Sequence, residues 1–483
     1  MDRPAKFSFA IRFGAKLTSE FEDGQVTRRV TALATAVLLS GGCGSWQRVG
    51  APDAPPGAGS TLPRLFDASS VYRSMGFLVG GGALPFVASV RYLAGPVPDS
   101  TLALFSISLT NQTLTFQRRG NEFVADYRVE AAFRTDSGSV VPVRQIGRDE
   151  QVRVRTFQET LRTDESIIFQ QFVTLPPGTY RVFVMVRDRN GPAFARAERL
   201  DTTPRFGGPG LTRPIPVYSA EGRANRGELP KLVANPRATL PYGADSLRFY
   251  VEAYGGAGGG GSKLVSRVVD AGDRQLWRDS TRLAGGSDLQ STTITVAPGS
   301  LPVGQAEVEA LPPPGRDTVR VRFLVSFSNQ WVITNFDEMQ SLLRYFERQE
   351  WVDSLRKAPP DKRPDVWRAF WKATDPVPIT PENEALDDYF KRVQQANIRY
   401  QDEGQPGWLT DRGEVFITIG EPDEVLDLSS GLDRSGIRAV RWTYTSLRLI
   451  LYFQDQTGFG RYRLTPSSRA EYQRVLARVR RSQ

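Results

Sequence analysis

The residues best suited to chemistry lie in the stretch Gly407–Arg412 and in the acidic turn that follows it. Asp411 would act as a general base or a metal ligand, helped by the carboxylates of Glu421, Asp423 and Glu424 in that turn. Thr410 would be a nucleophile only with a base next to it. If the chain is an enzyme, we therefore expect Asp411, Glu421 and Asp423 to be its catalytic residues, acting on a glycan or a peptide.

The composition removes most other enzyme chemistry. The 483 residues include no His and one Cys. Without His there is no Ser-His-Asp or Cys-His nucleophile system and no His-bearing metal site. One Cys cannot form an intramolecular disulfide or a thiolate zinc site. The Gly-rich run at Gly255–Lys263 lacks the Lys-Ser/Thr order of a phosphate-binding loop. The sequence predicts no metal and no cofactor.

The same stretch has a structural interpretation, which the residue types favour. Gly407 and Gly413 would permit a tight turn that enters a strand. Trp408 would bury its ring while its N–H finds a partner. Asp411 would accept hydrogen bonds from turn amides or pair with an arginine. A turn accounts for every residue, so we expect a structural corner rather than a catalytic site.

A binding surface is the third interpretation. Its residues would be those of the motif and two further tryptophans: Trp408, Thr410, Asp411, Arg412, Trp371 and Trp442. A tryptophan-rich groove would bind a peptide or a glycan. Packing of the same rings in a core is the competing interpretation.

The segment Thr27–Ser45 has the features of an export signal. Two arginines precede the short apolar run Val30–Leu39, which is about half the length of a membrane-spanning helix, and small residues lead to Cys43. It resembles a bacterial lipoprotein signal, in which the Cys carries the lipid and becomes the mature N-terminus. The position three residues before the Cys holds Ser40 rather than the usual Leu, so a cleaved signal with an incidental Cys is the alternative. Gly44 after the Cys predicts attachment to the outer membrane, facing the periplasm.

The rest of the chain divides by composition. Short runs with period-two alternation fill the middle, for example Thr101–Leu109, Phe123–Phe133 and Thr179–Asp188, which predicts β-sandwiches. The expected parts are a signal region at 1–43 (with a mis-assigned start before about residue 27), a flexible tether at 44–63, a β-sandwich-like module at 64–206, a second β-rich module at 207–334 and an α+β domain at 335–483. The fold class is therefore multidomain, with two all-β, immunoglobulin-like modules before the last domain.

Helical periodicity begins at Phe336. We predict helices over Phe336–Leu355 and Pro364–Lys372, and a third helix with Thr380 as N-cap and Pro381 at its first position. The predicted strands then lie near Glu414–Ile419, Val440–Tyr444, Arg448–Gln454 and Gly460–Leu464, before a closing helix over about Ser467–Arg480. Helices followed by a small antiparallel sheet and a helix make an α+β domain.

This last region resembles the GWxTD domain family. The resemblance rests on "FWKATDPVPITPENE", "YFKRVQQAN", "GWLTDRGEVFITIGEPDEV" and "RWTY", in this order, and the motif itself is Gly407–Asp411. Family members are exported bacterial proteins or lipoproteins with β modules before this domain, and the resemblance implies no reaction.

We therefore expect a non-catalytic lipoprotein of the cell envelope that is a scaffold or binding module for a protein or glycan, with a carboxylate-dependent hydrolase as the alternative. The chain carries a net charge of +9, but its arginines alternate along strands, as in Val152–Phe157, so we expect no nucleic-acid partner.

Overall fold

The computed structural model describes Leu65 and residues 68–482, except 136–142, 164–166, 245, 256–262, 284–287, 298, 300, 312–316, 329–330, 332, 334, 379, 381, 402–404 and 429–437. The predicted signal, Cys43, the tether and the tip of the Gly-rich run lie outside the described residues. No helix in the part of the chain that is described is both long and apolar enough to cross a membrane.

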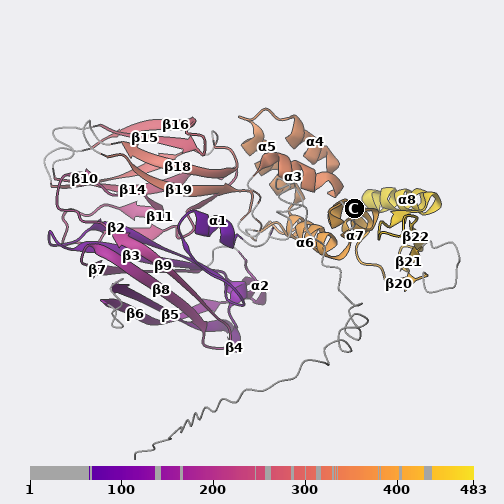
Figure 1. The fold of residues 1–483 in the computed structure, drawn as a ribbon, viewed down its shortest axis with the longest axis horizontal. Helices are drawn as coiled ribbons and strands as arrows, with labels where there is room; N and C mark the ends of the chain where they lie inside the picture. The colour runs from indigo at the N-terminus through magenta and orange to yellow at the C-terminus, as the bar shows by residue number, and fades with distance from the viewer. Residues whose placement is uncertain are drawn as a thin grey trace, which may run out of the picture. The chain divides into compact units, whose positions relative to one another are not determined.

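The first β module is built from two antiparallel sheets (Figure 1). One sheet has the order β1 (Leu78–Gly80), β2 (Phe86–Ala94), β3 (Thr101–Leu109), β7 (Ile167–Leu175), and the other has the order β4 (Gln117–Arg119), β5 (Glu122–Thr135), β8 (Gly178–Asp188), β9 (Phe194–Thr203), with β6 (Arg144–Val154) paired to β5. Three short helices accompany them, namely α1 (Ser69–Ser74), η2 (Asn111–Thr113) and α2 (Phe157–Thr160). In β8 every second residue from Tyr180 to Val186 is buried between the sheets. The alternation that predicted these strands is confirmed.

The second β module also has two sheets. The first contains β10 (Gly210–Leu211), β14 (Leu247–Tyr254), β11 (Ile215–Glu221) and β12 (Lys231–Ala234), with β17 (Leu289–Val296) paired to β14. The second has the order β13 (Thr239–Pro241), β19 (Val319–Ser326), β18 (Gly304–Leu311), β15 (Lys263–Asp270), β16 (Gln275–Arg282). Phe249 and Phe323 meet edge to face in the core between the two sheets, with ring centroids 5.5 Å apart.

Strand β3 is buried on both faces, which alternation did not predict. Its Phe105 and Ile107 belong to the core of the first module. On the opposite face Leu102 and Leu104 pack with Ile215 of β11. The central strand therefore lies between two layers and has no solvent-exposed face, as expected for a strand covered on both sides.

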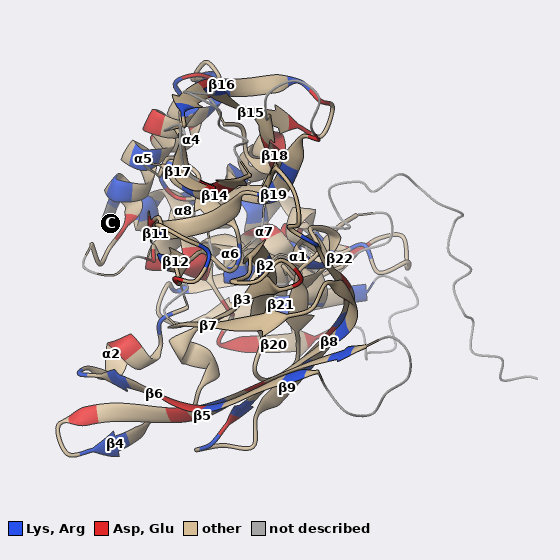
Figure 2. Cartoon of the chain, turned by 90° about the vertical axis from the view of Figure 1, so that its left-hand side faces the viewer, with Lys and Arg blue, Asp and Glu red and all other residues tan. Residues whose placement is uncertain are grey.

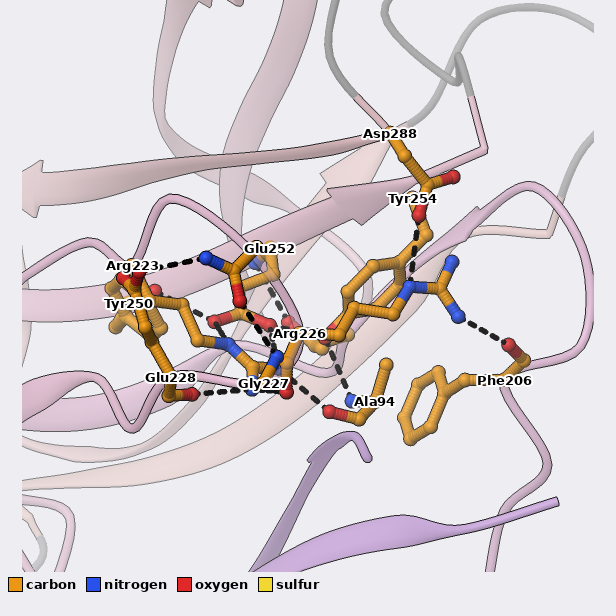
Figure 3. Close-up of polar contacts among 12 residues, drawn as sticks. Ala94, Phe206, Arg223, Arg226, Gly227, Glu228, Tyr250, Glu252, Tyr254 and Asp288 are labelled. Atoms are coloured by element: carbon orange, nitrogen blue, oxygen red, sulfur yellow. Dashed lines mark hydrogen bonds and ion pairs between the residues drawn. The ribbon is translucent and has the colours of Figure 1, made fainter. Parts of the chain in front are cut away.

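A buried ion pair of the second β module also contacts the first β module (Figure 3). The side chains of Arg223 and Glu252 are both fully buried, and two of the guanidinium nitrogens lie 2.9 Å from the two carboxylate oxygens. Arg223 also donates to the carbonyl of Ala94 at the end of β2 (2.7 Å). Tyr250 and Tyr254 donate their hydroxyls to Glu252. The pair thus has hydrogen bonds on every side, which is the condition for burying two charges.

The C-terminal region begins with helices. They are α3 (Phe336–Leu342), η4 (Leu343–Tyr345), α4 (Gln349–Lys357), α5 (Arg363–Thr374), α6 (Glu384–Arg399), η5 (Gly407–Leu409) and α7 (Asp411–Ile419). The single helix predicted from Phe336 to Leu355 is divided because Phe346 has an extended backbone between η4 and α4. The predicted N-cap Thr380 is also wrong, because Asn383 accepts the amide of Leu386 and starts α6.

The strand predicted at Glu414–Ile419 is the helix α7. Its residues Val415, Phe416 and Ile417 are all buried, and a short apolar run fits a buried helix as well as a strand. The helix signals are Thr410 before the run and Glu414 in the first turn. Strand β20 (Glu424–Asp427) was not predicted. The remaining order is as predicted, with the antiparallel strands β21 (Arg438–Tyr444), β22 (Leu449–Asp455) and β23 (Arg463–Leu464), and the closing helix α8 (Pro466–Ser482).

Candidate functional site

The motif Gly407–Asp411 forms the junction between the end of α6 and the start of α7. The amide of Gly407 donates to Asn397 Oδ1 near the end of α6 (3.1 Å). A Cβ on Gly407 would lie 2.4 Å from the carbonyl oxygen of Ala396, so only glycine allows this approach. Gly407 therefore lets the loop approach the end of α6 closely. The predicted role, a turn that enters a strand, is wrong.

Thr410 is the N-cap of α7 and is fully buried. Its Oγ1 accepts the amide of Gly413 (3.0 Å) and donates to the carbonyl of Gly407 (2.7 Å). The hydroxyl thereby satisfies one of the amides that a helix start leaves without a partner. Gly413 lies against the same loop, because a Cβ there would be 2.0 Å from the carbonyl oxygen of Gly407. The hydroxyl is committed to the backbone and is not a nucleophile in this geometry.

The carboxylate of Asp411 holds α7 to β23 and α8. It is 8% exposed, and its Oδ2 accepts the backbone amide of Leu464 (2.8 Å) and lies 2.7 Å from Nη2 of Arg469. Its Oδ1 lies 3.4 Å from Nη1 of Arg463. Asp411 is also in the first turn of α7, where a negative charge interacts favourably with the helix dipole. The predicted pairing with an arginine is present twice, and the predicted turn amide is replaced by a strand amide.

The three carboxylates proposed for catalysis do not meet. Glu421 pairs with Arg399 (2.7 Å), and Asp423 accepts the amide of Thr445 (2.6 Å). Asp411 is the first residue of α7, and the acidic turn follows the last residue of that helix. The helix has 9 residues and rises about 1.5 Å per residue, so about 13 Å separates Asp411 from the turn. A pair of glycosidase carboxylates needs about 5–10 Å.

Glu414 is the carboxylate that the sequence analysis missed. It lies one helical turn after Asp411, and its Oε2 is 3.7 Å from Nη1 of Arg469. Burial raises the pKa of Glu414 above its usual value, although Arg469 opposes this shift. The three-residue spacing from Asp411 would have identified Glu414, had this segment been predicted as a helix.

We expect the stability of the wild type relative to Glu414→Gln to fall as the pH rises. The raised pKa means that folded Glu414 binds a proton more tightly than unfolded Glu414. Its contribution is therefore complete below the unfolded pKa of about 4.3 and is lost as the pH rises through the folded pKa. Urea unfolding of both proteins at a series of pH values from about 4 to about 8, the range over which the carboxyl group loses its proton, measures the difference. A difference independent of pH would contradict the shift.

Two of the three tryptophans of the predicted groove, Trp408 and Trp442, pack in the core. Trp408 is 2% exposed and meets Tyr345 edge to face at 6.5 Å, and Trp442 is 2% exposed with its centroid 5.2 Å from that of Tyr400. Trp371 is half-buried. Trp408 and Trp442 therefore line no groove in this structure. The predicted partner of the Trp408 N–H is also absent among the described residues.

Arg412 is the last predicted binding residue. Its guanidinium stacks over the ring of Tyr462, 4.3 Å from the centroid, and over that of Tyr400 at 5.5 Å. Such stacking is a cation–π contact that joins the start of α7 to the residue before β23 and to the end of α6. The side chains of the motif and of Arg412 thus make contacts inside the domain.

Comparison with solved structures gives weak matches. A crystal structure of trypsin-activated alpha-2-macroglobulin from Escherichia coli is 11% identical over 52% of this chain, with a TM-score of 0.17, and this chain covers 17% of its length. The BSP domain of a biofilm-associated protein is 7% identical over 55% of this chain and 54% of its own, with a TM-score of 0.16. No curated protein matches the chain.

The profile of the GWxTD domain matches residues 316–472. The matched segment contains the motif, the helices on either side of it, the small sheet and the start of α8. It begins just before β19, so the profile also includes the last strand of the second β module. The chain is a GWxTD domain-containing protein.

Proposed function

We propose that this chain is a lipid-anchored, non-catalytic protein of the cell envelope that is a scaffold or binding module for a protein partner. The observation that carries the proposal is the structural role of the side chains of the motif. Thr410 caps α7, and Asp411 binds Leu464 and Arg469, so the polar side chains of this stretch hold the domain together. A domain of this kind contributes a surface rather than a reaction.

An exposed apolar face of the last domain supports the binding role. Leu426 of β20 lies opposite Arg441 of β21, which lies opposite Tyr452 of β22, and directly opposed residues share one face of a sheet. Leu426, Tyr452 and the nearby Ile450 are 40%, 39% and 43% exposed. Trp442 and Leu451 occupy the opposite, core face. Exposed apolar side chains gathered on one face are typical of protein-binding surfaces.

A photo-crosslinking side chain in place of Tyr452 tests the face in intact cells. We expect a discrete crosslinked product at this position and none at Arg474, which is exposed on α8. The same pattern at both positions, or no product at Tyr452, would contradict a specific surface.

The lipid anchor rests on Val30–Leu39 and Cys43. Two acyl chains are enough for stable membrane attachment, and Gly44 favours the outer membrane. The test is metabolic labelling with an alkyne fatty acid in a Gram-negative host. We expect label on the wild type and on Ser40→Leu, which restores the usual pattern, and none on Cys43→Ala. An unlabelled wild type would refute the anchor.

A further inference from the structure

A cavity of about 280 Å³ lies where the first β module meets the loop before β13. Its walls come from α1, from β1 and β2, from η2 and from Arg237 of that loop. Val79, Phe86 and Val87 form an apolar part, whereas Arg237 and Thr163 contribute polar atoms. The cavity is large enough for a small organic molecule and unites a cation with an apolar wall.

Arg237 is a buried residue whose Nε lacks a hydrogen-bond partner among the described residues. The residue is 8% exposed, and its side chain forms no hydrogen bond or ion pair with any described residue. A buried cation of this kind is strongly unfavourable unless it is paired. An acceptor bound in the cavity would pair with this N–H and balance the charge.

The second buried arginine of the described chain shows what full compensation looks like. Arg223 is 5% exposed and has Glu252 as a two-point partner, with the carbonyls of Ala94, Arg226 and Glu228 accepting its remaining hydrogens (Figure 3). Arg237 is 8% exposed and has no such partner among the described residues. The difference identifies Arg237 as a charge that the fold positions but does not neutralise.

The loop that carries Arg237 is rigidly held. Asn235 Nδ2 donates to the carbonyl of Thr239 (3.1 Å), and the amide of Leu324 in β19 donates to the carbonyl of Ala238 (2.9 Å). Tyr72 of α1 bonds to the hydroxyl of Thr239 at 3.0 Å. Ala238 has a φ of 49°, which alanine rarely adopts. The backbone at Arg237 is thus held at the cavity.

A second hydrogen-bonding group faces the same space. The hydroxyl of Thr163 lines the cavity, is buried and has no partner. Its backbone amide is occupied, because it donates to Oε1 of Glu382 (3.1 Å). The hydroxyl and the guanidinium together offer donors to an oxygen acceptor. The carboxylate of Glu382 behind Thr163 disfavours a ligand with several negative charges.

We propose that this cavity binds a monoanionic carboxylate attached to a small apolar group. The planar fork of an arginine matches the two oxygens of a carboxylate, and the single cation balances one negative charge. A phosphate dianion would leave its second charge uncompensated next to Glu382. The apolar body of the ligand packs against Phe86 and the two valines beside it. Such a carboxylate is found on a free small acid and on the last residue of a peptide.

Calorimetric titration of the full chain distinguishes these sources. The probes are hexanoate, benzoate, the tripeptide Gly-Leu-Phe and its C-terminal amide. We expect binding of at least one acid and none of the amide, and an Arg237→Met variant is expected to lose affinity at least tenfold. Arg237→Lys keeps the charge without the fork and is expected to lose less. Binding of hexanoate or benzoate alone identifies a small acid, and binding of the tripeptide identifies a peptide terminus.

The melting temperature without ligand provides a second, independent readout. Removing an unpaired buried charge is expected to raise the melting temperature in Arg237→Met, as removal of strain at a binding site commonly does. Thr163→Val is expected to weaken binding severalfold and leave the fold intact, and Arg278→Met, an exposed arginine of β16, is expected to change neither readout. A lower melting temperature for Arg237→Met would mean that the arginine is structural. That result, no binding of any acid probe, or equal binding of the amide would overturn the proposal.

Discussion

Gly413→Ala is expected to lower the free energy of unfolding by more than about 4 kcal/mol, which is among the largest effects of a single substitution. The new Cβ would lie 2.0 Å from the carbonyl oxygen of Gly407 and 3.0 Å from Cα of Trp408. Both are backbone atoms, which cannot turn aside. Helix propensity alone would make the alanine variant more stable by about 1 kcal/mol. A loss of stability would therefore be due to the close approach of the two backbone segments. Chemical unfolding followed by tryptophan fluorescence measures it.

Gly81→Ala is the matched control, because a Cβ there meets nothing within 4 Å and the position is exposed. We expect a change within about 0.5 kcal/mol for it. Wild-type stability in Gly413→Ala would show that α7 and the loop at Gly407 are farther apart than the structure has them. The motif would then not be the corner described above.

Glu252→Gln is expected to cost about 3–5 kcal/mol, because it leaves Arg223 charged and buried without its carboxylate. The amide of a glutamine also cannot accept on both sides, so the hydroxyls of Tyr250 and Tyr254 compete for one oxygen. Since Arg223 reaches Ala94 of the first β module, the loss is expected to loosen the contact between the two β modules. Hydrogen exchange at β2 and β14 locates the effect, and urea unfolding gives its size.

An exposed ion pair of the same module is the control for Glu252. Glu221 and Lys231 lie 3.5 Å apart with their side chains 74% and 84% exposed. Glu221→Gln is expected to change stability by less than about 0.5 kcal/mol, as surface pairs usually do. Equal losses for the two glutamates would contradict the role given to the buried pair.

Much of the fold was predictable because alternation and helical periodicity are local signals. Strands β3, β5 and β8 of the first β module and helices α5 and α8 follow their patterns within a few residues. Strand β3 departs from alternation because a second layer covers its outer face. Helix α7 was mistaken for a strand because its short apolar run Val415–Ile417 is buried throughout. Both errors come from tertiary packing, which no local period records.

The site was predictable only in part. The residues of the motif and a pairing of Asp411 with arginine could be inferred, but not which arginine, because Arg469 is 58 residues further along the chain. Arg237 gave no signal at all, since its loop has an ordinary composition. Its isolation is visible only when the surrounding side chains are in place.

The central claim is that the side chains of the motif hold the domain together, and the free energy of unfolding of Thr410→Val and Asp411→Asn tests it most directly. Thr410→Val removes the N-cap of α7 and is expected to cost about 1–2 kcal/mol. Asp411→Asn leaves Arg469 without a charged partner and is expected to cost about 1–3 kcal/mol. Asp388→Asn, in an exposed pair with Lys391, is the control that should change nothing. Unchanged or raised stability in both motif variants would contradict the account and indicate that these side chains serve a ligand or a reaction.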